Sequence, residues 1–259
     1  MTLKITAISA LLLIQLNVGC GPNLAPTLEK RLANIKQNAN IYTIRHEDKK
    51  NAILFVHGIF GDHVTTWVSE DGNAYWPTMI ADDPDFDEFD IYSVGYDSPL
   101  FAQTSSLEQT STALLNDLRS AGIFNKYQQL HFVTHSMGGL IAKRMTELVE
   151  NQETEFDRIR SIVFIATPAQ GASVNGLYKM FGFIGNPQLR AMQTALESDG
   201  MKIVENSWIV LLDNRDKRRK LFPKSYCAYE TRKTFWLSIV TQMESITRCD
   251  DPPAYPIAK

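Results

Sequence analysis

The chain has 259 residues, of which 44% are hydrophobic and 21% are charged, and its formal net charge is −3. This apolar share is ample for a packed core, and the charged share is too low for an intrinsically disordered chain. A slightly acidic chain also lacks the basic patch with which nucleic-acid-binding proteins contact phosphates. With 14 glycines and three cysteines, the chain is neither collagen-like nor a disulfide scaffold. Composition therefore favours a globular α/β or α+β protein.

The first 20 residues predict a signal peptide. Residues 1–4 carry one positive charge, residues 5–16 are almost wholly apolar, and Gly19-Cys20 follows. The apolar run is shorter than the ~20 residues that span a bilayer, and a small residue before the cleavage point is typical of secretory signals. A cysteine in the next position is similar to a bacterial lipoprotein signal, in which that cysteine is lipidated. We therefore expect export to the cell envelope and, more narrowly, a lipid anchor at Cys20 that attaches the protein to a membrane.

Residues 21–38, a polar linker or a first helix, precede a regular alternation of strand-like and helix-like segments. Amphipathic helices are expected at residues 107–121 and 140–148. Runs rich in apolar and β-branched residues predict strands at 41–45, 52–57, 90–94, 130–134, 161–165, 225–229 and 237–241. Such alternation is typical of parallel strands joined by crossover helices, so we expect one three-layer α/β domain over residues 39–259. A helix-leaning insertion at 171–206, after the strand at 161–165, occupies a place where a lid could sit.

A predicted strand leads directly into Ser136, and Gly138 and Gly139 open the next helix without a linker. This order is typical of a strand–nucleophile–helix turn, usually G-x-S-x-G, with Thr134 here in place of the first glycine. The turn strains the backbone and projects the serine hydroxyl above the sheet, while the helix N-terminus offers free N–H groups to an oxyanion. The alternative is that Ser136 only caps the helix. The pattern favours Ser136 as a nucleophile and the Met137 N–H as an oxyanion donor.

The segment 52–61 is a second indication of the same chemistry. Its apolar run ends at His57-Gly58, and Gly61 follows three residues later. Gly58 lets the chain turn so that a backbone N–H, which we assign to Ile59, faces the same point as the first amide of the helix. We expect His57 to anchor this loop rather than to act as a base.

The chain resembles α/β-hydrolases, specifically the lipase-like branch related to bacterial serine esterases and to GPI inositol-deacylase and SERAC-like proteins. The resemblance covers residues 51–256 and implies a mostly parallel central sheet flanked by helices, with ester hydrolysis by a Ser–acid–His triad. The matching segments are HGIFGD at 57–62, Thr66-Trp67, Trp76-Pro77, Gly95-Tyr96-Asp97-Ser98, THSMGG at 134–139, and Ala166-Thr167-Pro168.

In this family the acid and then the histidine follow the nucleophile along the chain. Glu230, at the tip of the predicted strand 225–229, is the acid we expect; the alternatives are Asp213, Asp216 and Glu244. The resemblance places the catalytic histidine after the last strand, here 237–241, so the domain looks C-terminally truncated. The five histidines of the chain all precede Ser136: His46, His57, His63, His131 and His135. Among them, His63 follows the oxyanion loop and could turn toward Ser136.

Two hypotheses follow from these residues. The first is a monomeric serine hydrolase that acts on small-molecule or lipid esters, without cofactor, metal or nucleic acid. The second is a catalytically silent α/β-hydrolase-fold binding protein of the cell envelope. In an oxidising compartment Cys227 and Cys249 could form a disulfide, and the alternative is two buried thiols.

Overall fold

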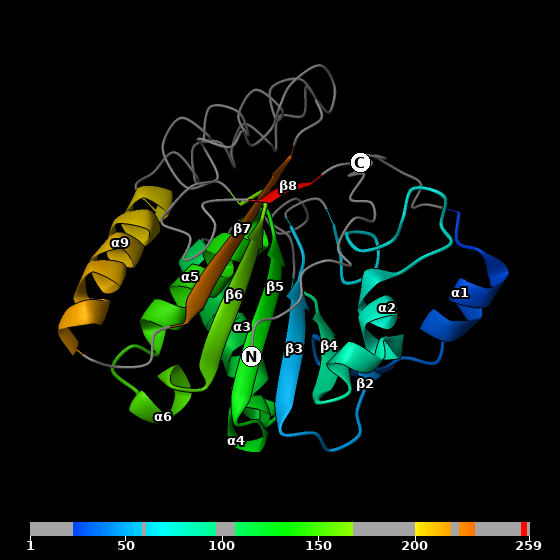
Figure 1. The fold of residues 1–259 in the computed structure, drawn as a ribbon, viewed down its shortest axis with the longest axis horizontal. Coiled ribbons are helices and arrows are strands. Elements are labelled where there is room, and N and C mark those ends of the chain that lie inside the picture. Colours follow the sequence, from blue (N-terminus) through cyan, green and yellow to red (C-terminus); the bar gives the residue numbers. More distant parts are fainter. Residues whose placement is uncertain are drawn as a thin grey trace.

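The computed structural model describes residues 23–58, 61–96, 107–167, 200–218, 223–230 and 255–257. In these ranges eight strands form one sheet in the order β1-β2-β4-β3-β5-β6-β7-β8 (Figure 1). The pairs β1/β2 and β2/β4 are antiparallel, and every other neighbouring pair is parallel. The strands are β1 (Lys36–Asn38), β2 (Ile41–Arg45), β3 (Asn51–Val56), β4 (Phe89–Val94), β5 (Gln129–His135), β6 (Ile159–Ile165), β7 (Lys224–Glu230) and β8 (Tyr255–Ile257).

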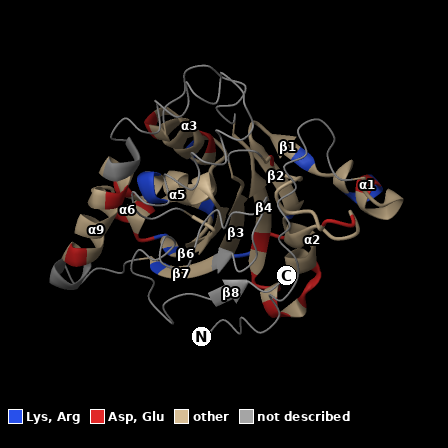
Figure 2. Cartoon of the chain, turned by 90° about the horizontal axis from the view of Figure 1, so that it is seen from above, with Lys and Arg blue, Asp and Glu red and all other residues tan. Residues whose placement is uncertain are grey.

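Helices cover both faces of the sheet (Figure 1). On one face α3, α5 and α9 pack against one another, and on the other α2 packs against β2 and β4. The helices are α1 (Pro26–Leu32), α2 (Trp76–Asp82), the 3-10 helix η2 (Pro84–Phe86), α3 (Leu107–Ser120), α4 (Ile123–Lys126), α5 (Met137–Leu148), α6 (Glu153–Phe156) and α9 (Gly200–Arg218). Acidic residues gather where α2 leads into η2, apart from α5 and α9 (Figure 2). The described helices include none that is both long and apolar enough to cross a membrane.

The strand β3 is buried on both faces. Ala52, Leu54 and Val56 belong to the core shared with α3, α5 and α9, whereas Ile53 and Phe55 belong to the core beside α2. Side chains alternate across a strand, so a strand covered by helices on both faces is apolar throughout. This explains the unbroken apolar run at residues 52–56.

The register of the parallel strands brings two turns to the same edge of the sheet. Val56 of β3 lies opposite Thr134 of its neighbour β5. Two residues beyond this pair, both strands have ended: the segment after β3 has reached Gly58, and the segment after β5 has reached Ser136. The two segments singled out from the sequence therefore meet.

The predicted mostly parallel sheet flanked by helices is confirmed, and six predicted strands match β2 to β7 to within two residues at each end. The predicted strand at 237–241 lies outside the described residues. The neighbour of β7 is β8, which contains Pro256 and is too short to show a periodic pattern. The helix α5 begins at Met137, three residues before the predicted start at residue 140. Its first turn includes Gly138 and Gly139, because close packing against neighbouring segments requires glycine at both positions.

Candidate active site

Ser136 stands between β5 and α5 in a backbone conformation that few residues adopt. Its φ is 50° and its ψ is −120°, and its N–H donates to the Ile165 carbonyl of β6 at 2.8 Å. A non-glycine residue at positive φ is strained and must be held by its surroundings. The side chain makes no capping hydrogen bond to α5, so the capping alternative is wrong. The backbone has the form of the expected elbow.

Gly138 and Gly139 are required by close packing. A Cβ at Gly138 would lie 2.4 Å from the His57 carbonyl oxygen, and one at Gly139 would lie 2.1 Å from Oγ1 of Thr167. Neither position has room for a side chain. The first turn of α5 is therefore in direct contact with the end of β3 and with Thr167, two residues after the end of β6.

Thr134, which replaces the first glycine of the usual pattern, is accommodated without a polar penalty. It is fully buried, and its hydroxyl donates to the Val163 carbonyl of β6 at 2.8 Å. A buried hydroxyl is unfavourable only when it lacks a partner. The larger residue thus fits beside Ser136.

His57 holds the start of the loop after β3 with both ring nitrogens engaged. Nδ1 lies 2.8 Å from the Gly58 carbonyl oxygen, and Nε2 lies 3.2 Å from the Tyr96 backbone nitrogen. The Tyr96 amide can only donate, so Nε2 accepts and Nδ1 carries the proton given to Gly58. The Tyr96 ring stacks on His57 with 4.1 Å between centroids, and its hydroxyl donates to the His57 carbonyl. Burial lowers the pKa of His57 to about 4, so the ring is neutral at pH 7. Both of its nitrogens already have hydrogen-bond partners.

The His63 ring is engaged with β2 rather than with Ser136. It stacks on Tyr42 with 3.3 Å between centroids and 6° between planes. Burial lowers its pKa from the ordinary value. In the sheet, β2 is separated from β5 by both β4 and β3. The structure does not bring His63 together with Ser136.

His135 precedes Ser136 and is enclosed. Its ring is edge-on to Trp67, with 6.4 Å between centroids, and its Nδ1 is 2.7 Å from where a Cβ of Gly58 would be. Within the described ranges neither ring nitrogen has a hydrogen-bond partner, and burial lowers the pKa of His135 to about 4. It is a neutral imidazole packed against Gly58.

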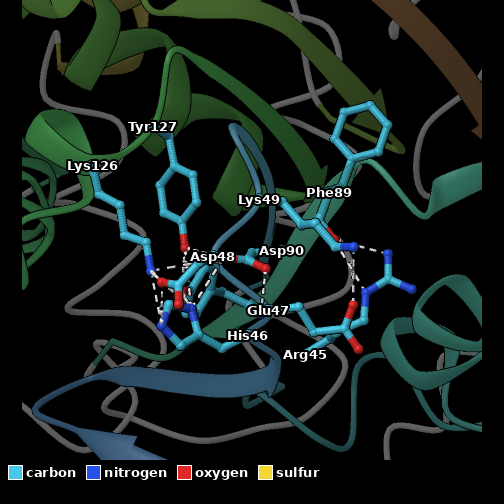
Figure 3. Close-up of polar contacts among 10 residues, drawn as sticks. Arg45, His46, Glu47, Asp48, Lys49, Phe89, Asp90, Lys126 and Tyr127 are labelled. Atoms are coloured by element: carbon cyan, nitrogen blue, oxygen red, sulfur yellow. Dashed lines mark hydrogen bonds and ion pairs between the residues drawn. The ribbon is translucent and has the colours of Figure 1, made fainter.

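His46 belongs to a polar cluster at the opposite edge of the sheet, where β4 begins (Figure 3). Its Nδ1 lies 3.0 Å from Oδ2 of Asp90, and its Nε2 lies 2.8 Å from Nζ of Lys126. The Tyr127 hydroxyl also donates to Oδ2 of Asp90, at 2.7 Å. Asp90 is completely buried, and the Glu47 amide donates to its Oδ1 at 2.8 Å, so both carboxylate oxygens have partners. The cluster is remote from Ser136 and stabilises the fold.

Glu230 is the last residue of β7 and lies in register with Ile257 of β8. Because β7 is parallel to β5 and two places from it, the backbone of Glu230 is at the same edge as Ser136, roughly 10 Å along the sheet. By contrast, Asp213 is exposed on α9, and Asp216 belongs to the same helix. Glu244 lies outside the described residues. The assignment of Glu230 as the acid stays a prediction.

Ile59, Cys20 and Cys249, to which the sequence assigns an oxyanion amide, a lipid anchor and a disulfide, also lie outside the described ranges. Cys227, buried in β7, is disulfide-bonded, so a free thiol at this position is wrong. Its pairing with Cys249 stays a prediction. The described side chains contain no group of three or more His, Cys, Asp or Glu that could hold a metal ion.

Two residues that shape this site had no role assigned from the sequence. Tyr96 fixes His57 from 39 positions along the chain, and Thr167 fills the space beside Gly139. Both belong to segments that carry the family resemblance, which is the only signal the sequence offers for them.

The sheet order, the elbow at Ser136 and the turn after β3 define an α/β-hydrolase fold. The mature form of the Bacillus licheniformis lipase BlEst2 aligns with a TM-score of 0.50 at 14% identity, covering 82% of this chain and 84% of that one. The lipase-esterase related protein from Clostridium acetobutylicum ATCC 824 aligns with a TM-score of 0.45 at 12% identity, covering 85% of this chain and 90% of that one.

The chain belongs to the family described as Domain of unknown function (DUF7379), whose profile matches residues 27–186. It is also similar to Protein SERAC1. The Bos taurus protein is 30% identical over 193 residues, which are 62% of this chain and 28% of that protein. The Homo sapiens protein is 25% identical over 218 residues, 70% of this chain and 32% of that protein. The chain spans about a third of the length of these relatives.

Proposed function

We propose that this chain is a serine hydrolase of ester bonds, of the lipase or esterase type, with Ser136 as the nucleophile. The proposal rests on the conformation of Ser136, which has a positive φ at a strand–helix turn and does not cap α5. Strained backbone of this kind persists where the surrounding structure enforces it, and it clusters at active sites. BlEst2, a lipase, shares the fold. The substrate class is a small-molecule or lipid ester.

Two backbone amides would hold the oxyanion, those of Met137 and Ile59. Met137 is the first residue of α5, whose N-terminus carries a partial positive charge. The Nδ1–H of His57 donates to the Gly58 carbonyl, which therefore points toward the imidazole ring. The peptide that carries this carbonyl also carries the Ile59 N–H, to which we assign the second donor. Each such donor contributes roughly 10²–10³ in rate.

In this mechanism Glu230 would orient a base and stabilise its positive charge. The rings of His57 and His63 are committed to other partners, and His135 is enclosed. We therefore expect slow turnover by the 259-residue chain. Loss of the base from a Ser–His–acid unit lowers kcat about 10⁶-fold and leaves roughly 10³–10⁴ over the reaction in water.

The environments of these histidines also favour a second candidate, a catalytically silent binding protein with the same fold. Such a protein would bind an ester-like ligand at the oxyanion site without turning it over. Its expected location is the cell envelope, which residues 1–20 support. Mass spectrometry of the native N-terminus tests this location, because an unprocessed Met1 contradicts export.

A fluorophosphonate probe and p-nitrophenyl butyrate together test the enzyme proposal. We expect slow covalent modification at Ser136, identified by peptide mass spectrometry, and hydrolysis above the buffer rate. Ser136→Ala should lose both. Ser111→Ala is the matched control, because in the described part of the chain the Ser111 hydroxyl donates to the Leu107 carbonyl of its own helix α3.

Turnover that survives in Ser136→Ala contradicts the proposal. Modification of Ser136 without measurable ester hydrolysis favours the binding protein instead.

A further inference from the structure

The loop at residues 58–61 is followed directly by Asp62, whose side chain bonds the backbone of the next turn. Oδ1 of Asp62 accepts from the amides of Val64 and Thr65, both at 2.7 Å. The Asp62 amide in turn donates to Oγ1 of Thr65 at 3.1 Å. One exposed carboxylate therefore fixes the backbone of the turn that receives the loop.

This turn is fastened to the sheet on two sides. The carbonyl of His63 accepts from the Tyr75 hydroxyl at 2.7 Å and from the Ser93 hydroxyl of β4 at 2.8 Å. Trp67, at the end of the turn, packs edge-on against Phe55 of β3 with 5.2 Å between centroids. The turn is thus anchored to the strand from which the loop departs and to its neighbour.

A displacement of the turn would reach the oxyanion loop directly. Gly61 is pressed against the turn, since a Cβ there would lie 1.8 Å from Oγ1 of Thr66. The Gly61 amide donates to the Gly58 carbonyl at 3.3 Å. That carbonyl belongs to the peptide whose N–H we assign to the oxyanion. The turn held by Asp62 and the ring of His57 therefore converge on one peptide.

We infer that Asp62 is a positioning residue for the oxyanion loop, acting through the turn at residues 62–65 and without contact to the substrate. The inference rests on the proposed function of Ser136 and adds a residue to it. An acceptor oxygen is what the turn requires. Asn at this position keeps that oxygen, and Ala removes it.

A second capped turn nearby provides a matched control. Oδ1 of Asp71 accepts from the Ser69 hydroxyl at 2.6 Å and from the Asn73 amide at 3.0 Å. These hydrogen bonds lower the pKa of Asp71 to about 2. The turn closes a hairpin bridged at Val68 and Tyr75, and Ser69 and Asn73, with which the Asp71 side chain bonds, belong to this same turn. Asp71→Ala removes the same kind of cap one step further from the loop, in a hairpin that meets the turn at residues 62–65 through the Tyr75 hydroxyl.

The experiment compares Asp62→Ala, Asp62→Asn and Asp71→Ala in the full chain. The readouts are the rate of Ser136 modification by the fluorophosphonate, the kcat and KM for p-nitrophenyl butyrate, and hydrogen exchange in the peptide 57–67. We expect Asp62→Ala to slow modification and kcat about tenfold, a fraction of the loss for a missing oxyanion donor. KM should change less than twofold, and exchange at 57–61 should accelerate. Asp62→Asn and Asp71→Ala should behave like the wild type.

Equal modification rates in Asp62→Ala and Asp71→Ala would overturn the inference, as would a failure of Asn to restore the rate. If the wild-type Ser136 is not modified at all, the proposed function fails on its own. In that case hydrogen exchange alone tests whether Asp62 positions the loop. Acceleration at 57–61 in Asp62→Ala alone supports its role in holding the loop, and unchanged exchange overturns it.

Discussion

At the scale of the residue, two glycines of this chain are needed for different physical reasons. A Cβ at Gly138 would lie 2.4 Å from the His57 carbonyl oxygen, so that position is closed by packing. A Cβ at Gly122 would meet nothing within 4 Å, but its φ is 73°, a conformation that disfavours side chains. The contact at Gly138 affects the site, and the strain at Gly122 affects only stability.

Substitution at these two positions separates the effects. Gly138→Ala should slow fluorophosphonate modification of Ser136 by about 100-fold, because the first turn of α5 must move and takes the Met137 amide with it. Gly122→Ala should leave that rate unchanged and lower the free energy of unfolding by about 1–2 kcal/mol. Modification is followed by mass spectrometry and unfolding by urea titration. A wild-type rate in Gly138→Ala would contradict the contact.

The residues of the site differ in how far the sequence could predict them. Ser136, Gly138 and the His57-Gly58 pair were predictable because the chemistry depends on their close neighbours along the chain. Tyr96 and Asp62 act through contacts with residues or turns whose positions only the folded sheet fixes. Their own sequence neighbourhoods carry no separate signal for those contacts.

At the scale of the element, a buried ion pair joins the nucleophile helix α5 to α9. Lys143 and Glu205 form a direct salt bridge, with side chains 3% and 9% exposed. The Lys143 ammonium also lies 5.1 Å from the centroid of the Phe164 ring. Burial lowers the pKa of Lys143, and the charge of Glu205 opposes that shift. The pair holds α9 against the helix that begins after Ser136.

Breaking this pair should destabilise the fold more than replacing it. Lys143→Met alone leaves Glu205 buried without its cation and should lower the free energy of unfolding by about 3–5 kcal/mol. The double variant Lys143→Met with Glu205→Met should lose much less, because no uncompensated charge remains. Urea titrations of the single and double variants measure the coupling. A single variant as stable as the double would show that the pair is not coupled.

The elements themselves were largely predictable, and their contacts were not. The strands β2 to β7 each contain a run of apolar or β-branched residues, which the period of a strand makes visible. Lys143 illustrates the limit. In the sequence it stands beside Arg144 and looks like part of a solvated helix face. Its burial is decided by α9, more than 50 residues later.

At the scale of the whole molecule, buried titratable groups determine how stability responds to pH. Burial lowers the pKa of His57, His131 and His135 to about 4 from an ordinary 6.5. Burial acts in the opposite direction on Glu147 of α5, whose pKa rises from 4.5 to about 7 even though Arg144 bonds its carboxylate.

These shifts have opposite consequences. Between pH 6.5 and 4 the unfolded chain binds protons at the three histidines and the folded chain does not, so acid destabilises the fold. Between pH 4.5 and 7 the folded chain keeps a proton on Glu147 that the unfolded chain has lost, so rising pH removes stability. On going from pH 7 to pH 5, three histidines lower the free energy of unfolding and one glutamate raises it. The free energy of unfolding should therefore be lower at pH 5 than at pH 7.

His131 allows this balance to be tested away from Ser136. Its ring lies edge-on to Phe89, and Nδ1 is 2.7 Å from the Ser161 hydroxyl. His131→Gln removes one of three similar titrations, and Glu147 already cancels about one of the three, so the loss of stability from pH 7 to pH 5 should shrink by about half. Glu147→Gln removes the opposing titration and should enlarge that loss. Urea unfolding at pH 5, 6 and 7, followed by tryptophan fluorescence, measures both. A wild-type chain that is more stable at pH 5 than at pH 7 would show that the buried histidines do not dominate the pH dependence of stability. An unchanged pH dependence in His131→Gln would show that His131 does not contribute to it.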